Sequence, residues 1–253
     1  SPVSPVVFAL LFMGVTAFVV YNGVEGGIER VSRYMMPVLL VLVVVIAGYS
    51  LTLHHTDDAG QLRTGVQGFL YYIIPNFEGL TIGRFLQILL DAMSQLFFSL
   101  SVSMGIMITY GSYVKPEVNL NRAVNQIEIF DTGVALLAGM MIIPAVFVFS
   151  GTDGMSAGPG LMFVSLPKVF AAKGKAGVFV GILFFVSAIF ATLTSCISVL
   201  EAIVANCMEI FHTGRKKTVL VLTIIYLAAS AVIALGYSIF YFEVPLPNGS
   251  VGQ

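Results

Sequence analysis

Six apolar stretches, each about 18 residues or longer, follow one another along this chain and constrain its fold more than any other feature. A helix of that length can cross the hydrocarbon core of a bilayer. Hydrophobic residues make up 58% of the 253 residues and charged residues only 10%, whereas a soluble domain carries roughly 25% charged residues. We therefore predict an all-α, polytopic membrane helix bundle forming a single transmembrane domain. The expected spans are 5–22, 28–52, 86–113, 122–149, 177–210 and 218–241, with outer loops at 53–85 and 150–176.

The two ends of the sequence suggest that this domain is incomplete. The chain opens with Ser-Pro-Val-Ser-Pro and no Met, and it closes with the loop-like Pro-Asn-Gly-Ser-Val-Gly-Gln. No signal peptide is visible. We therefore expect the sequence to be a fragment of a longer protein.

Several function classes are disfavoured by composition. The formal net charge of −1 argues against a nucleic-acid partner. Cys196 and Cys207 lie about three helical turns apart in one apolar run, so they predict neither a disulfide nor a metal site. No Ser-His-acid constellation, phosphate-binding glycine loop or cluster of metal ligands occurs. We therefore expect that the protein is not an enzyme.

The lysines and arginines predict how the chain is oriented, because basic residues concentrate in short cytoplasmic loops. Alternate connections carry two different sets. The set expected on the cytoplasmic side is Arg30, Arg33, Lys115, Arg122, Arg215, Lys216 and Lys217. The long loops 53–85 and 150–176 and both ends of the chain are then expected to face outward from the plasma (inner) membrane.

The third span is unusual because its middle is polar. It carries Ser94, Gln95, Ser99, Ser101, Ser103 and Gly105. Serine and glycine weaken a helix interior. A helix that opens at mid-depth must use its freed backbone groups to line a cavity or to bind something. The alternative is a continuous helix whose serines bond back to the preceding turn.

Three further polar groups lie inside spans, where charge costs about 3 kcal/mol on insertion scales. Asp131 is either interfacial or, if its helix begins near Arg122, close to the midplane and in need of a cation. Thr194 and Ser195, with the carbonyl of Ala191, form a set of hard oxygens suited to an alkali cation; the alternative is back-bonding within the helix. Glu201 is interpreted as a paired or protonated structural acid, and alternatively as part of a coupling relay.

Three motifs together resemble the neurotransmitter:sodium symporter family, and most of all its bacterial amino-acid transporters. They are Gln95-Leu-Phe-Phe-Ser-Leu-Ser-Val-Ser-Met-Gly105, Ile108-Thr-Tyr-Gly-Ser-Tyr113 and Ala191-Thr-Leu-Thr-Ser195. The resemblance implies that the chain holds the fourth to ninth of eleven or twelve transmembrane helices of an inverted-repeat fold with one discontinuous helix. It also implies that residues 161–172 form a helical outer loop that covers the outer vestibule.

The resemblance further implies roles for individual residues. A first sodium ion would be bound by Ser99 and by Asp131, where the family usually has Asn, and a second by the Ala191 carbonyl with the hydroxyls of Thr194 and Ser195. Gln95 matches a residue beside the chloride site of animal members, and Ala135 stands where a hydroxyl or an acid is usual. Asp131 would supply the missing negative charge, so chloride is not expected to be required. The positions that match the substrate pocket are Phe98, Ser101, Met104, Ser195 and Val199.

The function expected from the resemblance is sodium-coupled symport of a small, hydrophobic or aromatic L-amino acid by alternating access. Met104 stands where an aromatic residue is frequent, and its flexible thioether leaves room for a larger apolar side chain. The helices expected to make most contacts with the substrate's carboxylate and amine lie outside the chain. Two alternatives stay open: a proton-coupled transporter of the same fold that uses Asp131 or Glu201, and a channel or receptor without a transport cycle. Which amino acid is carried and the oligomeric state do not follow from the sequence.

Overall fold

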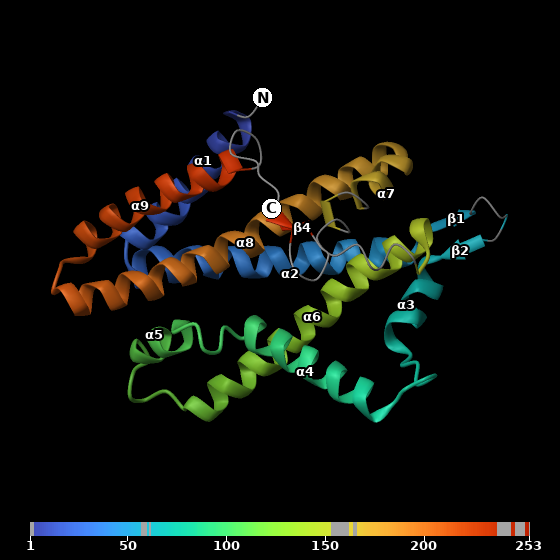
Figure 1. The fold of residues 1–253 in the computed structure, drawn as a ribbon, viewed down its shortest axis with the longest axis horizontal. Coiled ribbons are helices and arrows are strands. Elements are labelled where there is room, and N and C mark those ends of the chain that lie inside the picture. Colours follow the sequence, from blue (N-terminus) through green and yellow to red (C-terminus); the bar gives the residue numbers. More distant parts are fainter. Residues whose placement is uncertain are drawn as a thin grey trace. The chain divides into compact units, whose positions relative to one another are not determined.

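The computed structural model describes residues 3–56, 60, 62–152, 162–163, 166–236, 244–245 and 251–252 of the chain. Within them the chain is mainly helical (Figure 1). The helices are α1 (Val3–Tyr21), the π-helical turn η1 (Val24–Glu29), α2 (Arg30–Leu51), α3 (Gly65–Ile73), α4 (Ile82–Ser99), α5 (Ile106–Ser112), α6 (Leu120–Ser150), α7 (Leu166–Ala172), α8 (Gly174–Phe211) and α9 (Arg215–Gly236). The strands are β1 (His54–Thr56), β2 (Leu62–Thr64), β3 (Val244–Pro245) and β4 (Val251–Gly252), which pair as two antiparallel hairpins.

Among the described residues, four helices are long and apolar enough to cross a membrane. They are Val24–Leu51, Leu120–Ser150, Gly174–Phe211 and Arg215–Leu235. The apolar helix Pro5–Tyr21 is shorter. The third expected span, 86–113, is divided between α4 and α5. The polytopic helical bundle predicted from hydropathy is therefore what the chain forms.

The chain divides into two compact units. The first unit comprises Ser1–Tyr34, Ile108–Ser112 and Thr192–Gln253, and the second comprises Met35–Met107 and Tyr113–Ala191. In the first unit α1 and α9 pack along each other. The buried residues of α1 that serve this packing include Ala17 and Val20, and Val219 is buried on α9.

The core of the second unit is built from helical stripes. Val43, Ile46 and Ala47 of α2 are buried, with three- and four-residue spacing, in one cluster with Met141 and Ala145 of α6. The same cluster includes Val169 and Phe170 of α7 and Val180 and Phe184 of α8. Such a stripe on each helix is what buries one face while leaving the other apolar faces exposed to lipid.

Two close contacts fix α6 in this unit. The Ser50 hydroxyl of α2 donates a buried hydrogen bond of 2.6 Å to the Met141 carbonyl. Gly68 lets α3 approach α6, since a Cβ there would lie 2.7 Å from the Pro144 Cα. These contacts hold the C-terminal half of α6, whose N-terminal half carries Asp131.

The expected outer loop at 53–85 contains more regular structure than its polar composition predicts. β1 and β2 pair His54 with Thr64, and α3 then begins with a capping box between Thr64 and Gln67. The Lys173 ammonium donates a 2.5 Å hydrogen bond to the His54 carbonyl, which ties the hairpin to the end of α7. The helical outer loop expected at 161–172 contains α7 in its described part. Residues 161, 164 and 165 lie outside the described residues.

The polar middle of the third span breaks the helix, as the first interpretation of its serines predicted. α4 ends at Ser99 and α5 begins at Ile106 (Figure 1). Between them Ser101, Ser103 and Gly105 have φ angles of 54°, 69° and 77°. Left-handed residues interrupt a right-handed helix, and each costs an ordinary L-residue roughly 1–2 kcal/mol. The alternative of a continuous helix is therefore wrong.

Replacing Gly105 with alanine is expected to destabilise the protein by about 1 kcal/mol, because φ is 77° and a Cβ is strained there. Apart from Gly105 and its two chain neighbours, no atom of the described residues lies within 4 Å of the added Cβ, so backbone strain is the expected cause. Gly111→Ala on α5 is the matched control, since its Cβ also meets nothing within 4 Å and it lies in a helix. That control is expected to be neutral or to stabilise by up to about 1 kcal/mol. Denaturant unfolding of the full-length protein in micelles measures both; an equal response of the two variants would contradict the role of the left-handed turn.

Candidate functional site

The break in the third span brings Ser99 against Asp131. Ser99 is the last residue of α4, and its hydroxyl donates a 2.5 Å hydrogen bond to Oδ1 of Asp131 on α6. Both residues belong to the second unit. A hydrogen bond to a carboxylate is shorter and stronger than one between neutral groups. Two residues 32 positions apart therefore form one oxygen-rich pair at the point where the helix opens.

Asp131 lies well inside its helix. α6 begins at Leu120, so Asp131 is about 16 Å along the axis at 1.5 Å per residue. Its neighbours Ile129 and Phe130 are exposed apolar side chains. In the part of the chain that the structure describes, Asp131 has a neutral hydroxyl rather than a cation as its side-chain partner. A carboxylate and a hydroxyl are hard oxygen ligands, which suit Na⁺ or another hard cation.

The second predicted cation set lies on one turn of α8. Ala191, Thr194 and Ser195 are three and four residues apart, so they share a face of the helix. α8 is helical from Gly174 to Phe211, so its backbone does not open at this turn. A carbonyl oxygen and two hydroxyls are the donor types that an alkali cation binds, and this turn carries all three.

The residues predicted to line a substrate pocket fall into two groups. Phe98, Ser101 and Met104 surround the helix break in the second unit, and the side chains of Phe98 and Met104 are exposed. Ser195 and Val199 stand one turn apart on α8 in the first unit. Each group is brought together within its own unit by the local helix geometry.

Gln95 lies one turn before Ser99 and on the same face of α4. Asp91 continues this face one turn further, which extends a polar stripe towards the start of the helix. The described residues of α4 include no buried side chain. The sequence analysis did not single out Asp91, although its four-residue spacing from Gln95 was the available signal.

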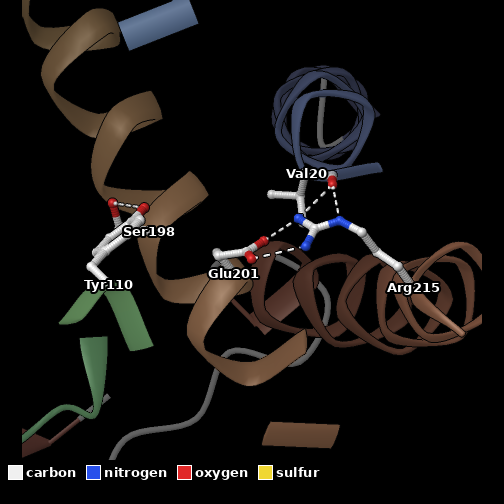
Figure 2. A network of polar contacts seen from close by, with 5 residues as sticks. All are labelled: Val20, Tyr110, Ser198, Glu201 and Arg215. Atoms are coloured by element: carbon white, nitrogen blue, oxygen red, sulfur yellow. Dashed lines mark hydrogen bonds and ion pairs between the residues drawn. The ribbon is translucent and has the colours of Figure 1, made fainter. Parts of the chain in front are cut away.

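Glu201 is fully buried, and its carboxylate is paired with Arg215 at the start of α9. Nη1 of Arg215 donates to Oε1 over 3.0 Å, and Nη2 donates to Oε2. The same guanidinium also donates from Nε and Nη2 to the Val20 carbonyl at 3.0 and 2.9 Å (Figure 2). This geometry favours the interpretation of Glu201 as a structural acid that joins α8 and α9 to the end of α1.

A hydrogen bond that the sequence analysis missed joins α5 to α8. The Tyr110 hydroxyl donates to Ser198 Oγ over 3.0 Å (Figure 2). Ser198 in turn donates to the Thr194 carbonyl over 3.1 Å. No periodicity predicts a contact between residues 88 positions apart, so the sequence held no signal for it.

Three relatives of this chain are each longer than it is. A sodium-dependent transporter of Bacillus subtilis (strain 168) is 37% identical over 217 residues, which are 86% of this chain and 45% of the relative. One of Methanocaldococcus jannaschii is 30% identical over 244 residues, covering 94% of this chain and 47% of the relative. The human sodium- and chloride-dependent GABA transporter 2 is 25% identical over 245 residues, covering 94% and 36%. The chain thus spans about half or less of the length of these curated relatives.

Among solved structures, the crystal structure of MhsT in complex with L-phenylalanine is similar over 99% of this chain and 53% of that chain. The TM-score is 0.79 and the sequence identity is 36%. The model of the sodium:neurotransmitter symporter family matches residues 5–242. The chain belongs to the sodium:neurotransmitter symporter family.

Proposed function

We propose that the full-length protein is a sodium-coupled symporter of a small, hydrophobic or aromatic L-amino acid in the plasma membrane. The observation that carries this proposal is the break in the helix between α4 and α5. The break begins directly after Ser99, whose hydroxyl is bonded to Asp131. Unwound backbone and polar side chains in a membrane helix are how transporter folds bind ions and substrate near the midplane. The relatives described as sodium-dependent transporters support sodium as the coupling ion.

Two sodium ions are proposed as co-substrates. The first is bound by Ser99 and Asp131, and the second by the Ala191 carbonyl with Thr194 and Ser195. Each ion binds one conformation of the protein better than the other, and the amino acid favours the same conformation. Linkage then lets the sodium gradient drive uptake, because an ion can shift the equilibrium only by its difference in affinity for the two conformations.

Two sets of residues are proposed to contact the amino acid: Phe98, Ser101 and Met104 beside the opened helix, and Ser195 and Val199 on α8. Met104 is flexible and adapts to a large apolar side chain. The similarity to MhsT, which was crystallised with L-phenylalanine, supports an aromatic or large hydrophobic substrate. Contacts to the substrate's carboxylate and amine come from helices outside this chain.

Chloride is proposed not to be required, since Asp131 places a negative charge beside the first sodium ion. Ala135, one turn further on α6, offers no hydroxyl for an anion. Gln95 then stays as a polar neighbour on the Ser99 face of α4. Replacing chloride with gluconate is expected to leave uptake unchanged.

Uptake into proteoliposomes containing the full-length protein tests this function. A panel of labelled amino acids is supplied with an inward sodium gradient, with choline in place of sodium, and with an inward proton gradient without sodium. Saturable, concentrative uptake of a large apolar amino acid that requires sodium is expected. Uptake that follows the proton gradient alone would establish the proton-coupled alternative, and dissipative flux without concentration would establish a channel.

Asp131→Asn is expected to raise the sodium concentration for half-maximal uptake by about tenfold or more. The amide keeps the size of the side chain and can still bond to Ser99, but it loses the charge, and interactions with a charged group contribute about 1.5–3 kcal/mol. Glu128→Gln, an exposed acid one turn earlier on α6, is the matched control. Sodium titration of uptake measures both variants; equal shifts would show that Asp131 acts through the general potential rather than as a ligand.

A further inference from the structure

The second part of the broken helix, α5, is a short element that follows an irregular connection. α5 contains seven residues and directly follows Gly105, whose φ is 77°. Ser101 and Ser103 are also left-handed, so the backbone between α4 and α5 lacks a regular helical hydrogen-bond ladder. Hinges are such segments, in which a few residues absorb a change in backbone angles. The contacts that the side chains of α5 make therefore bear on how α5 is held.

One side-chain contact that holds α5 within the first unit is the hydrogen bond from Tyr110 to Ser198. The phenolic hydroxyl donates to Ser198 Oγ over 3.0 Å, and Ser198 donates to the Thr194 carbonyl over 3.1 Å. Both hydrogen bonds are partly buried. The Ser198 hydroxyl thus accepts one hydrogen bond and donates another. Both bonds run from Tyr110 towards the Thr194 carbonyl, so each polarises the other.

The helix that receives Tyr110 is itself anchored. Glu201 lies one turn beyond Ser198 on α8 and is paired with Arg215, which also bonds to the Val20 carbonyl (Figure 2). This arrangement joins α8 to α9 and α1 within the first unit. Because α8 is held on this side, a bond between Tyr110 and Ser198 constrains α5 rather than α8.

We propose that Tyr110 is a positioning residue whose hydroxyl holds α5 against the α8 turn that runs from Thr194 to Ser198. Through Ser198, the chain of two hydrogen bonds reaches the carbonyl of Thr194. Thr194 is the residue whose side chain is proposed to bind the second sodium ion. Docking of α5 therefore favours the conformation in which the Thr194 and Ser195 hydroxyls are arranged for sodium, and sodium favours docking. This inference rests on the proposed function.

The test uses the full-length protein and labelled L-phenylalanine as the probe. The variants are Tyr110→Phe, Ser198→Ala and the two together. Binding of L-phenylalanine to each variant is measured in two ways. The first is the sodium concentration that gives half-maximal binding, and the second is the dissociation constant of phenylalanine at saturating sodium. The number of binding sites per mole of protein gives the folded fraction. Tyr226→Phe on α9 and Ser187→Ala, which back-bonds to the Phe184 carbonyl on α8, are matched controls.

Each single variant is expected to raise the sodium requirement by about two- to tenfold, the range for one neutral hydrogen bond. The phenylalanine dissociation constant at saturating sodium is expected to stay within about twofold, because excess ion restores the docked state. Both single substitutions remove the bond between Tyr110 and Ser198, and Ser198→Ala also removes the bond from Ser198 to the Thr194 carbonyl. The double variant is therefore expected to match Ser198→Ala, because Tyr110→Phe has no bond left to remove once Ser198 is absent. The two controls are expected to behave as the wild type.

Unchanged sodium dependence in Tyr110→Phe, or fully additive effects of the two substitutions, would overturn the inference while leaving the proposed function intact. A phenylalanine dissociation constant that stays raised at saturating sodium would also overturn the inference. If Tyr110→Phe yields no binding sites, Ser198→Ala alone decides between these outcomes. Binding of L-phenylalanine by the wild type with no sodium dependence would instead reject the proposed function.

Discussion

Sodium-dependent uptake is expected to be abolished when Thr194→Ala and Ser195→Ala are combined in the full-length protein. The two hydroxyls are the side-chain oxygens of the proposed second sodium site, and α8 runs through this turn without opening. The backbone contribution to this proposed site is the Ala191 carbonyl alone, so the two hydroxyls are most of its ligands. Losing two contacts to a cation, each contributing about 1.5–3 kcal/mol, lowers sodium affinity by a factor of about 100 or more.

The measurement compares initial rates in sodium and in choline for proteoliposomes that contain equal amounts of transporter. Thr223→Ala is the control, because Thr223 on α9 donates a 2.7 Å bond to the Val219 carbonyl and so represents an ordinary back-bonded hydroxyl. That variant is expected to retain uptake. If the double variant kept the sodium dependence of the wild type, the second sodium site could not be at this turn.

The break in the third span could be predicted from the sequence, because serines and a glycine replace apolar residues in its middle. Which residues adopt left-handed angles could not. Ser101 and Ser103 do so although serine has a Cβ, and Val102 between them does not. Backbone hydrogen bonds from Ser101 to the Phe98 carbonyl and from Val102 to the Phe97 carbonyl close this turn, whereas intrinsic preferences alone would have placed the left-handed angle at Gly105.

The pairing of Ser99 with Asp131 was predicted through the family resemblance, and the structure brings the two side chains together. The partner of Glu201 was not predicted. Arg215 was read as a marker of the cytoplasmic side, whereas its guanidinium lies against a fully buried carboxylate. The tight turn from α8 to α9, with His212 at a φ of 49°, folds the chain back so that residues 14 positions apart meet. Hydropathy finds the two helices but not the geometry of the turn that joins them.

Glu201→Ala is expected to cost about 3–5 kcal/mol of stability, the range for removing one partner of a buried ion pair. The Glu201 side chain is 0% exposed and that of Arg215 is 22% exposed. Without the carboxylate, the guanidinium keeps its bonds to the Val20 carbonyl but loses the charge that balances it. Denaturant unfolding of the full-length protein in micelles measures the change.

Glu29→Ala provides the control, since Glu29 pairs with Arg33 one turn away on the helix surface. Those two side chains are 55% and 70% exposed, and a surface pair contributes about 0–1 kcal/mol. Both variants remove an ion pair, so the difference between their losses of unfolding free energy measures the effect of burying the pair. Glu201→Gln retains hydrogen-bonding capacity, and an intermediate loss of stability is expected. Glu201 would instead belong to a coupling relay if Glu201→Gln were as stable as the wild type but changed how uptake depends on pH. A purely structural acid has no reason to alter the pH profile while the fold stays intact.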